Sequence, residues 1–460
     1  MNSSTLSPQP VQQRSRKVYM ETFGCQMNQA DSDIALARLA EAGYHEVSSG
    51  DEADLIIYNT CSVRDGAEGK IRGRLGAIKQ RKSSDPNLRI AVMGCMAQRA
   101  KEELLKTYPQ VDLVVGTDQF VHIPELLERL PEEGRLVATN FGDFENSGNW
   151  STRRSDGVNA WIPVMRGCNY NCTYCIVPTT RGREKSRPPH LIEQEAREAV
   201  AAGHAQVTLL GQTVDAYGKT LGDGSNLATL LRRLHAIEDL KRIRFVTSHP
   251  KDITDELLDT MAELPKVAKH LHVPAQCGSN RILRLMGRRY TREGYLDFVR
   301  RARERMPDVE LLTDIIVGFP RESDADFQET RTLMQEVGFA GAYVFMYSPR
   351  PGTGANNLAD DVPLEVKKAR CNDILGLQLA HQEAWYRTLH GREYEVLVEG
   401  LSKNNDQRIQ GRSIGNLNIL VDRFTADGRD LLQQRGQLLR VRIRDNTNLA
   451  LYADPVQAHG

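Results

Sequence analysis

Three cysteines, Cys168, Cys172 and Cys175, stand in the stretch GCNYNCTYC, with three residues between the first pair and two between the second. A structural zinc site normally takes four protein ligands, and a ferredoxin-type run has two residues between successive cysteines and a fourth cysteine. No other cysteine lies near this stretch in sequence. Three thiolates on one loop instead suit a 4Fe-4S cluster that leaves one iron open to bind and activate another molecule.

A second set of cysteines follows three predicted strands. Cys25 comes after KVYMETFG, Cys61 after DLIIYNT and Cys95 after LRIAVMG. The carboxyl ends of parallel strands line one crevice, and neighbouring strands lie about 5 Å apart. We therefore expect these thiols to converge on one point. The alternative is three unrelated buried thiols, since cysteine is often buried.

The elements that must position the second set belong to a predicted domain at 16–132. Short apolar strands alternate there with amphipathic helical stretches, which is typical of a parallel sheet covered by helices. Residues 1–15 are polar and contain two prolines, and we predict a disordered tail. Residues 133–153 are rich in glycine, asparagine and serine, and we predict a linker.

The loop GCNYNCTYC belongs to a predicted core domain at 154–385 with six strand and helix units. Right-handed crossovers make such a series a partial (β/α)6 barrel, related to the eight-unit TIM barrel. Polar and glycine-bearing stretches follow the strands, at the edge where such barrels build active sites. The last part, 388–456, shows five short strand patterns and predicts a small all-β barrel of a kind that often binds nucleic acid. The overall fold class is therefore α/β with an all-β C-terminal domain.

The composition is balanced, with 60 lysines and arginines against 60 aspartates and glutamates in 460 residues. Any contact with nucleic acid must therefore come from a local basic patch. No apolar run reaches the roughly 18 residues of a membrane span, and the polar N-terminus lacks the apolar core of a signal peptide. We expect a cytoplasmic protein without membrane contact, whose eight cysteines are ligands, catalytic groups or free thiols rather than disulfides.

The GCNYNCTYC loop, at the end of a first barrel strand, closely resembles the cluster loop of the radical S-adenosylmethionine superfamily. This resemblance implies that the open iron binds S-adenosylmethionine and that reductive cleavage yields a 5′-deoxyadenosyl radical, while the protein orients the cofactors. It also implies cofactor contacts in three loops. The residues concerned are Tyr174, then Gly211 and Gln212 in GQTVDAYG near the methionyl group, and Gly318 and Glu322 in GFPRE near the adenine.

Both cysteine sets together extend the resemblance over residues 16–455 to the methylthiotransferase family. Membership implies two 4Fe-4S clusters, one held by Cys25, Cys61 and Cys95 and the other by the GCNYNCTYC cysteines. It also implies a C-terminal TRAM domain that binds the substrate nucleic acid. The stretches FGCQMN and LLGQTVDAYG resemble the members that act on a prenylated adenosine in tRNA.

The resemblance implies that carbon 2 of N6-(dimethylallyl)adenosine, next to the anticodon, receives a methylthio group. One S-adenosylmethionine would donate a methyl group to a sulfur on the N-terminal cluster, and another would supply the radical that abstracts the hydrogen. A radical is needed because an unactivated aromatic C–H bond resists acid, base and nucleophile alike. The implied partners are the tRNA anticodon loop, an electron donor such as flavodoxin or ferredoxin, and the sulfur and iron-sulfur assembly machinery.

Other functions remain open at this stage. Within the family, the substrate can be a threonylcarbamoylated adenosine of tRNA or an aspartate of a ribosomal protein. Outside the family, a radical enzyme acting on a small molecule or peptide would show no dependence on tRNA. A non-catalytic iron-sulfur protein that binds RNA would hold clusters without cleaving S-adenosylmethionine.

Two basic stretches are candidates for RNA contact. LLRVRIRD alternates apolar residues with Arg440, Arg442 and Arg444, which places three arginines on one strand face. The alternative is a solvated strand face balanced by nearby acids. RGREKSRP carries Arg181, Arg183 and Arg187 just after the cysteine loop, where a basic strip can guide an anticodon loop with splayed bases.

Several reactive residues depart from this scheme. Cys277 stands where the family more often has serine, and Arg321 stands where it often has glycine. We interpret Cys277 and Cys371 as free thiols, because both cysteine triplets are complete without them. Three histidines lie on or after predicted barrel strands, and we assign none of them as a metal ligand: His249, His270 and His272.

Overall fold

The computed structural model describes residues 16–62, 65–142 and 157–456, and it divides the chain into two compact units. The first unit ends at Gly142, and the described part of the second begins at Gly157. Each unit is described here by itself. The predicted tail at 1–15 and the part of the predicted linker from 143 onward lie outside the described residues.

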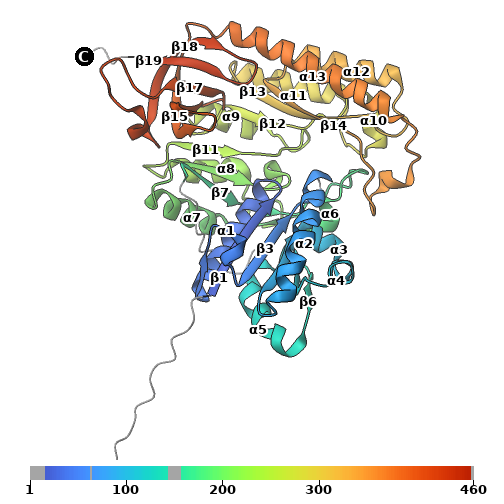
Figure 1. Ribbon diagram of the computed structural model, residues 1–460. Coiled ribbons are helices and arrows are strands. Elements are labelled where there is room, and N and C mark those ends of the chain that lie inside the picture. Colours follow the sequence, from blue (N-terminus) through green and yellow to red (C-terminus); the bar gives the residue numbers. More distant parts are fainter. Residues whose placement is uncertain (1–15, 63–64, 143–156, 457–460) are drawn as a thin grey trace, which may run out of the picture. The chain divides into compact units, whose positions relative to one another are not determined.

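The first unit is a six-stranded parallel sheet in the order β2-β1-β3-β4-β5-β6. Figure 1 labels β1, β3 and β6 of this sheet and the helices α1 to α5 around it. The apolar residues of β3, β4 and β5 are buried because helices cover the sheet, as the alternating pattern predicts. The strands are β1 Arg16–Phe23, β2 Tyr44–Glu46, β3 Leu55–Thr60, β4 Arg89–Gly94, β5 Leu113–Val115 and β6 Leu136–Ala138. The helices are α1 Gln26–Glu41, α2 Asp65–Ser84, α3 Cys95–Ala100, α4 Glu102–Thr107 and α5 Ile123–Glu133.

Strand β6 corrects the expected start of the linker at 133. Residues 136–138 pair in parallel with β5, with Leu113 opposite Leu136 and Val115 opposite Ala138. The short apolar run in GRLVATN is thus the sixth strand of the sheet. It was missed because three residues between polar stretches give almost no periodic signal.

The second unit begins with the predicted six-strand barrel. Two three-stranded parallel sheets, β11-β10-β7 and β12-β13-β14, are linked by a parallel bridge between Ile243 and Val267. The six strands therefore follow one another in chain order, which confirms the partial (β/α)6 arrangement (Figure 1). Their bounds are β7 Asn159–Pro163, β10 Gln206–Leu210, β11 Arg242–Phe245, β12 His270–His272, β13 Glu310–Val317 and β14 Gly341–Met346. A small antiparallel pair, β8 Met165–Arg166 and β9 Lys185–Ser186, flanks the cysteine loop.

The barrel helices begin at polar caps. Thr254 accepts a hydrogen bond from the Leu257 amide and Ser323 one from Asp326, which satisfies amides that the first helical turn leaves free. Gly338 ends α12 in the left-handed region, with φ +58°. The helices are α6 Val177–Arg181, α7 Pro189–Ala201, α8 Leu227–His235, α9 Asp255–Glu263, α10 Asn280–Leu285, α11 Arg292–Arg305, α12 Asp324–Val337 and α13 Leu364–Arg387.

The chain ends in the predicted small barrel, a closed five-stranded one in the order β15-β16-β17-β19-β18. Its strands are β15 Glu393–Ser402, β16 Asn405–Ser413, β17 Asn418–Asp422, β18 Leu438–Asn446 and β19 Leu451–Pro455. Alternate residues of β18 are buried, among them Val441 and Ile443. Across both units, the described helices contain none that is long and apolar enough to cross a membrane.

Candidate functional site

The GCNYNCTYC loop lies between β8 and α6, at the edge of the barrel where the strands end. Its three thiols are free; Cys172 is buried, and Cys168 and Cys175 are half-buried. Gly167 begins the loop with φ +74°, and a Cβ there would lie 2.0 Å from the Arg183 carbonyl oxygen. Only glycine fits this turn, so the start of the cysteine loop is fixed by the backbone behind it.

The donor set fits an iron-sulfur cluster better than a single ion. Burial, with a smaller contribution from neighbouring thiols, raises the pKa of Cys175 to about 12 and also raises that of Cys168. These sulfurs therefore become thiolates only beside a strong positive charge, as a metal provides. Within the described ranges, no three His, Cys, Asp or Glu side chains converge closely enough for one ion. A cubane binds each thiolate through a different iron, so its ligands need not meet at one point.

Gly211 and Gln212 follow β10 and touch the cysteine loop. The side-chain oxygen of Gln212 accepts a 2.6 Å hydrogen bond from the Gly167 amide. A Cβ on Gly211 would lie 2.6 Å from the Met165 side chain, so this position has no room for a larger residue. The neighbouring Thr213 hydroxyl lies 3.4 Å from the Cys168 sulfur. The loop expected to approach the methionyl group thus supports the cysteine loop directly.

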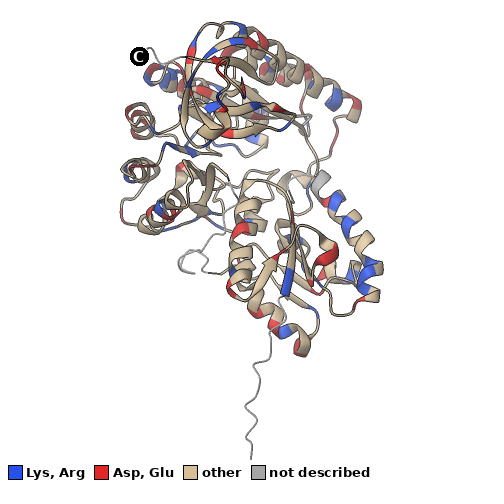
Figure 2. Cartoon of the chain, turned by 60° about the vertical axis from the view of Figure 1, so that its left-hand side comes forward, with Lys and Arg blue, Asp and Glu red and all other residues tan. Residues whose placement is uncertain are grey.

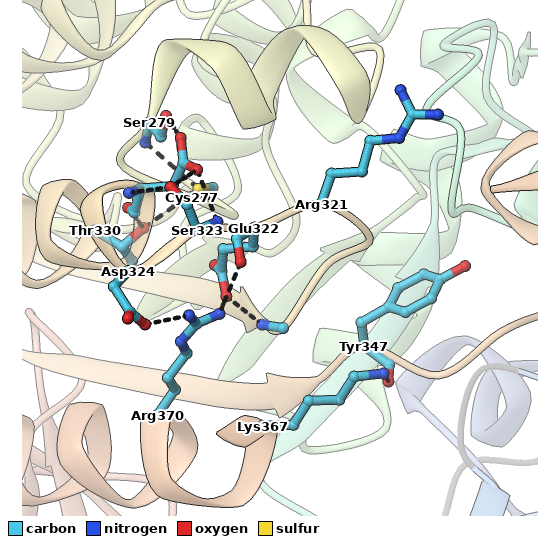
Figure 3. A network of polar contacts seen from close by, with 12 residues as sticks. Cys277, Ser279, Arg321, Glu322, Ser323, Asp324, Thr330, Tyr347, Lys367 and Arg370 are labelled. Carbon is cyan, nitrogen blue, oxygen red and sulfur yellow. Dashed lines mark hydrogen bonds and ion pairs between the residues drawn. The ribbon is translucent and has the colours of Figure 1, made fainter. Parts of the chain in front are cut away.

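Gly318 and Glu322 shape the turn after β13 (Figure 3). The Glu322 carboxylate accepts hydrogen bonds from the Gly318 amide at 2.6 Å and from the Arg370 guanidinium at 2.7 Å. Gly318 has φ +68°, and a Cβ there would lie 2.3 Å from the Lys367 side chain. Arg321 in the same turn also has a positive φ, of +67°, which glycine adopts more readily. Glu322 therefore holds the turn in shape through one of its oxygens.

Tyr174 packs beside this turn. Its ring meets Phe319 edge to face, with centroids 6.5 Å apart. Phe319 and Cys277 belong to one buried cluster, against which Tyr174 packs. The Cys277 sulfur lies 3.2 Å from the Thr330 hydroxyl, and burial raises its pKa to about 12. Cys277 thus has the contacts of a neutral core thiol.

The cysteines of the first unit follow the ends of three adjacent strands, β1, β3 and β4. In the sheet register Phe23 lies opposite Thr60, and Thr60 lies opposite Gly94. Cys61 and Cys95 directly follow the last two of these residues, and Cys25 follows Phe23 by two positions. Three thiols separated by 36 and 34 residues in sequence therefore lie at the same edge of the sheet.

Two asparagines that the sequence interpretation missed hold this edge together. The Asn28 side-chain amide donates to Asn59 Oδ1 at 2.9 Å and to the Thr60 carbonyl at 3.2 Å. The Asn59 amide donates to the Asn28 carbonyl at 2.7 Å, and the Cys25 thiol donates to Asn28 Oδ1 at 3.3 Å. Both side chains are fully buried. Their one signal in the sequence was their place next to cysteines, in GCQMN and NTC.

Gly94 gives a stability test of this edge. Its φ is +94°, and a Cβ would lie 2.4 Å from Asn59 Oδ1. We expect Gly94→Ala to destabilise the protein by about 2 kcal/mol or more, because backbone strain and a clash add. The control is Gly73→Ala in α2, where no atom lies within 4 Å of the added carbon; it should leave stability unchanged or raise it by up to about 1 kcal/mol. Urea unfolding followed by circular dichroism measures both, and equal midpoints for the two variants would contradict the expectation.

The arginines of RGREKSRP separate into two groups. Arg187 is 2% exposed, and its guanidinium bonds to Glu195 and to the Pro163 carbonyl, both at 2.7 Å. Arg181 is 4% exposed. These two positions correct the expected basic strip, because a buried guanidinium cannot reach a phosphate without breaking the core. Arg183 is exposed and is still a candidate.

Arg440, Arg442 and Arg444 point outward from β18, as expected, and acids lie beside all three. Glu393 pairs with Arg440 at 2.8 Å and with Arg442 at 2.6 Å, while Arg444 pairs with Asp422 and Asp454. Figure 2 shows basic and acidic positions interleaved over the C-terminal barrel. Exposed ion pairs of this kind contribute little energy, so the arginines can exchange carboxylate for phosphate at small cost.

The remaining candidates have ordinary surroundings. His249 stacks on Tyr170 with ring centroids 3.8 Å apart, and burial lowers its pKa to about 2, which keeps it neutral. His272 contacts Asp314 at 2.9 Å, and burial also lowers the pKa of His270. Cys371 on α13 is half-buried.

Two family descriptions match the chain. The one described as "Uncharacterized protein family UPF0004" covers residues 17–116, and "Radical SAM superfamily" covers residues 162–334. Among solved structures, the radical S-adenosylmethionine methyltransferase TsrM from Kitasatospora setae superposes with a TM-score of 0.57 at 15% identity, over 74% of this chain and 75% of that one. That likeness concerns the fold.

Curated relatives match over nearly the whole length. The tRNA-2-methylthio-N(6)-dimethylallyladenosine synthase of Acetivibrio thermocellus is 46% identical over 93% of this chain and 88% of its own. The protein of the same name from Moorella thermoacetica is 45% identical over 94% of this chain and 96% of its own. With the radical SAM match and the strand-end cysteines, these relatives show that the chain belongs to the tRNA-2-methylthio-N(6)-dimethylallyladenosine synthase family of radical S-adenosylmethionine methylthiotransferases.

Proposed function

We propose that this enzyme transfers a methylthio group to carbon 2 of N6-(dimethylallyl)adenosine, next to the anticodon of tRNA. Relatives that are 41–46% identical to this chain over most of their length bear the name of this activity. The observation within the chain that supports it best is the register that aligns Phe23, Thr60 and Gly94, because it gives the first unit its own three-thiol edge. A radical enzyme without sulfur insertion has no evident use for that edge.

Two 4Fe-4S clusters form part of the proposal. Cys168, Cys172 and Cys175 would hold the one that the radical SAM family implies, and Cys25, Cys61 and Cys95 would hold the second. When bound, the clusters and S-adenosylmethionine supply the methyl group, the sulfur chemistry and the hydrogen-abstracting radical. The protein's residues orient these groups: Gln212 fixes the cysteine loop through Gly167, and Asn28 fixes the backbone of Cys25 by accepting a hydrogen bond from its amide.

The RNA contacts are assigned by position and charge. The C-terminal barrel would act as a TRAM domain that binds the tRNA through Arg440, Arg442 and Arg444. Arg183, which lies closer to the cysteine loop in sequence, would make a further contact with the RNA. Phosphate contacts of this type make binding fall with rising salt. A flavodoxin or ferredoxin would supply electrons, the iron-sulfur assembly machinery would load the clusters, and the cytoplasm would be the place of action.

The decisive experiment is a single incubation of the anaerobically reconstituted enzyme. S-adenosylmethionine, a reductant and tRNA lacking the methylthio group are added, and the nucleosides are analysed by mass spectrometry. Methylthiolated dimethylallyladenosine is the expected product. Modification of threonylcarbamoyladenosine or of a ribosomal-protein aspartate instead would reject the substrate. Formation of 5′-deoxyadenosine from S-adenosylmethionine without any modified tRNA or protein would reject methylthio transfer.

A further inference from the structure

Arg288 lies against the cysteine loop without belonging to it. It sits in the turn between α10 and α11, and its guanidinium Nη1 donates a 3.4 Å hydrogen bond to the Cys172 sulfur. The other nitrogens are also used: Nη2 donates to the Pro274 carbonyl at 3.2 Å and Nε to the Tyr290 hydroxyl at 3.0 Å. Each of the three guanidinium nitrogens of Arg288 therefore donates a hydrogen bond, and one of these bonds goes to the sulfur.

The charge of this guanidinium has no carboxylate beside it in the described part of the chain. Arg288 is half-buried, and two fully buried arginines differ from it in this respect, since Arg187 pairs with Glu195 and Arg370 with Glu322, both at 2.7 Å. Arginine stays protonated at every relevant pH, and a cation removed from water needs an anion nearby. For the half-buried charge of Arg288, the groups that it touches in the described part of the chain are the candidates for that anion.

The phenol that touches Arg288 is not that anion. Burial raises the pKa of Tyr290, so its hydroxyl is neutral at pH 7 and donates to the Ala275 carbonyl at 2.8 Å. The Tyr290 ring lies under the guanidinium, 4.9 Å from its central carbon, and gives a cation–π contact without a net charge. Pro274 offers only a carbonyl oxygen. The Cys172 sulfur is the contacted atom that can carry a full negative charge, as a metal-bound thiolate does.

Backbone contacts hold Arg288 in this place. The Thr173 amide donates to the Met286 carbonyl at 2.9 Å, and the Thr173 hydroxyl donates to the Leu285 carbonyl at 2.9 Å. Gly287 has φ +70°, and a Cβ there would lie 3.0 Å from the Asn171 carbonyl oxygen. The turn that carries Arg288 is thus hydrogen-bonded to Thr173 on one side of Cys172 and lies close to Asn171 on the other, which keeps it beside the cysteine loop.

We propose that Arg288 is the fixed countercharge of the cluster held by Cys168, Cys172 and Cys175, acting through the Cys172 sulfur. Reduction adds one electron to the cluster, and a fixed cation beside a ligand sulfur stabilises the added negative charge. Hydrogen bonds and charge at the sulfurs are among the main determinants of cluster potential. Arg288 thereby makes the cluster easier to reduce, which favours the reductive cleavage of S-adenosylmethionine. The inference rests on the proposed cluster at these three cysteines and is independent of the tRNA substrate.

The test compares Arg288→Met with Arg288→Lys in the full-length chain. Cys25, Cys61 and Cys95 are replaced by alanine in all samples, so that one cluster gives the signal. The measurement is a redox titration followed by electron paramagnetic resonance. Arg288→Met should lower the equilibrium constant for one-electron reduction by about tenfold or more, and Arg288→Lys should restore most of it, because lysine keeps the charge. The control is Arg284→Met on α10, an exposed arginine, which should leave the constant unchanged.

Each outcome decides the inference. Equal constants for Arg288→Met and the parent protein at full iron content would overturn it. If Arg288→Met fails to hold iron, retention of iron by Arg288→Lys against its loss in Arg288→Gln supports the countercharge, and loss in both variants overturns it. An unchanged constant with weaker S-adenosylmethionine binding would assign Arg288 to the cofactor instead. If Arg288→Met lowers the constant for reduction as expected but the enzyme with all six cysteines does not modify tRNA, the proposed function is rejected. The role of Arg288 then still stands.

Discussion

Replacing Cys172 with alanine is expected to reduce the formation of 5′-deoxyadenosine from S-adenosylmethionine to the background rate. Cys172 is the buried member of the loop triplet and the one that Arg288 contacts. With its sulfur gone, two half-buried thiols are left to hold the proposed cluster, and the Arg288 guanidinium loses its contact with sulfur. The measurement is anaerobic incubation with a strong chemical reductant, followed by chromatography of the products and iron analysis of the protein.

The matched control for Cys172 is Cys371→Ala. Cys371 is a half-buried thiol on α13, whose sulfur lies 4.0 Å from the Val344 carbonyl oxygen. That variant should keep the parent rate and iron content. Substantial formation of 5′-deoxyadenosine by Cys172→Ala would show that this loop is not the site at which S-adenosylmethionine is cleaved.

Replacing Cys61 with serine is expected to separate the two halves of the reaction. Cys61 is buried at the end of β3, between the other two strand-end cysteines in the sheet order β1-β3-β4. Serine keeps the volume and removes the soft ligand, so the sheet should fold while the second cluster fails to assemble. We expect this variant to form 5′-deoxyadenosine at a rate close to that of the parent and to form no methylthiolated nucleoside. Both products are measured from the same incubation.

Cys277→Ser provides the control for a buried thiol. Cys277 is 1% exposed and hydrogen-bonds to Thr330, as a serine there would also do. This variant should retain cleavage and methylthiolation alike. If Cys61→Ser still modified tRNA at the parent rate, the assignment of a second cluster to the first unit would be wrong.

The parts of the fold that the sequence predicts are those with local periodicity. The strands that precede Cys61 and Cys95 contain continuous apolar runs, and the strand before Cys25 contains the shorter run VYM. Their shared parallel direction follows from the helices between them. The six barrel strands and the five of the C-terminal barrel are predictable for the same reason. Strand β6 is not, because its three residues acquire their role only by pairing with β5.

The site residues divide along the same line. The six cysteines stand in local motifs, so their place at strand ends and on one loop can be inferred. Arg187 and Arg288 cannot be told apart from surface arginines by their neighbours in sequence. Arg187 forms a buried ion pair with Glu195 on α7, and Arg288 contacts Cys172, which lies 116 residues earlier in the chain. Such roles depend on contacts between distant segments, which composition and spacing do not record.

The two cysteine sets differ in how much of the chain must be folded before they exist. Cys168, Cys172 and Cys175 lie within eight consecutive positions, so the entropic cost of bringing them together is small even in an unfolded chain. Cys25, Cys61 and Cys95 come to the same edge of the sheet only when β1, β3 and β4 have paired in register. If the strand-end set holds the proposed second cluster, iron binding there is thermodynamically coupled to folding of the sheet, and a mutation that weakens the sheet also weakens its affinity for iron.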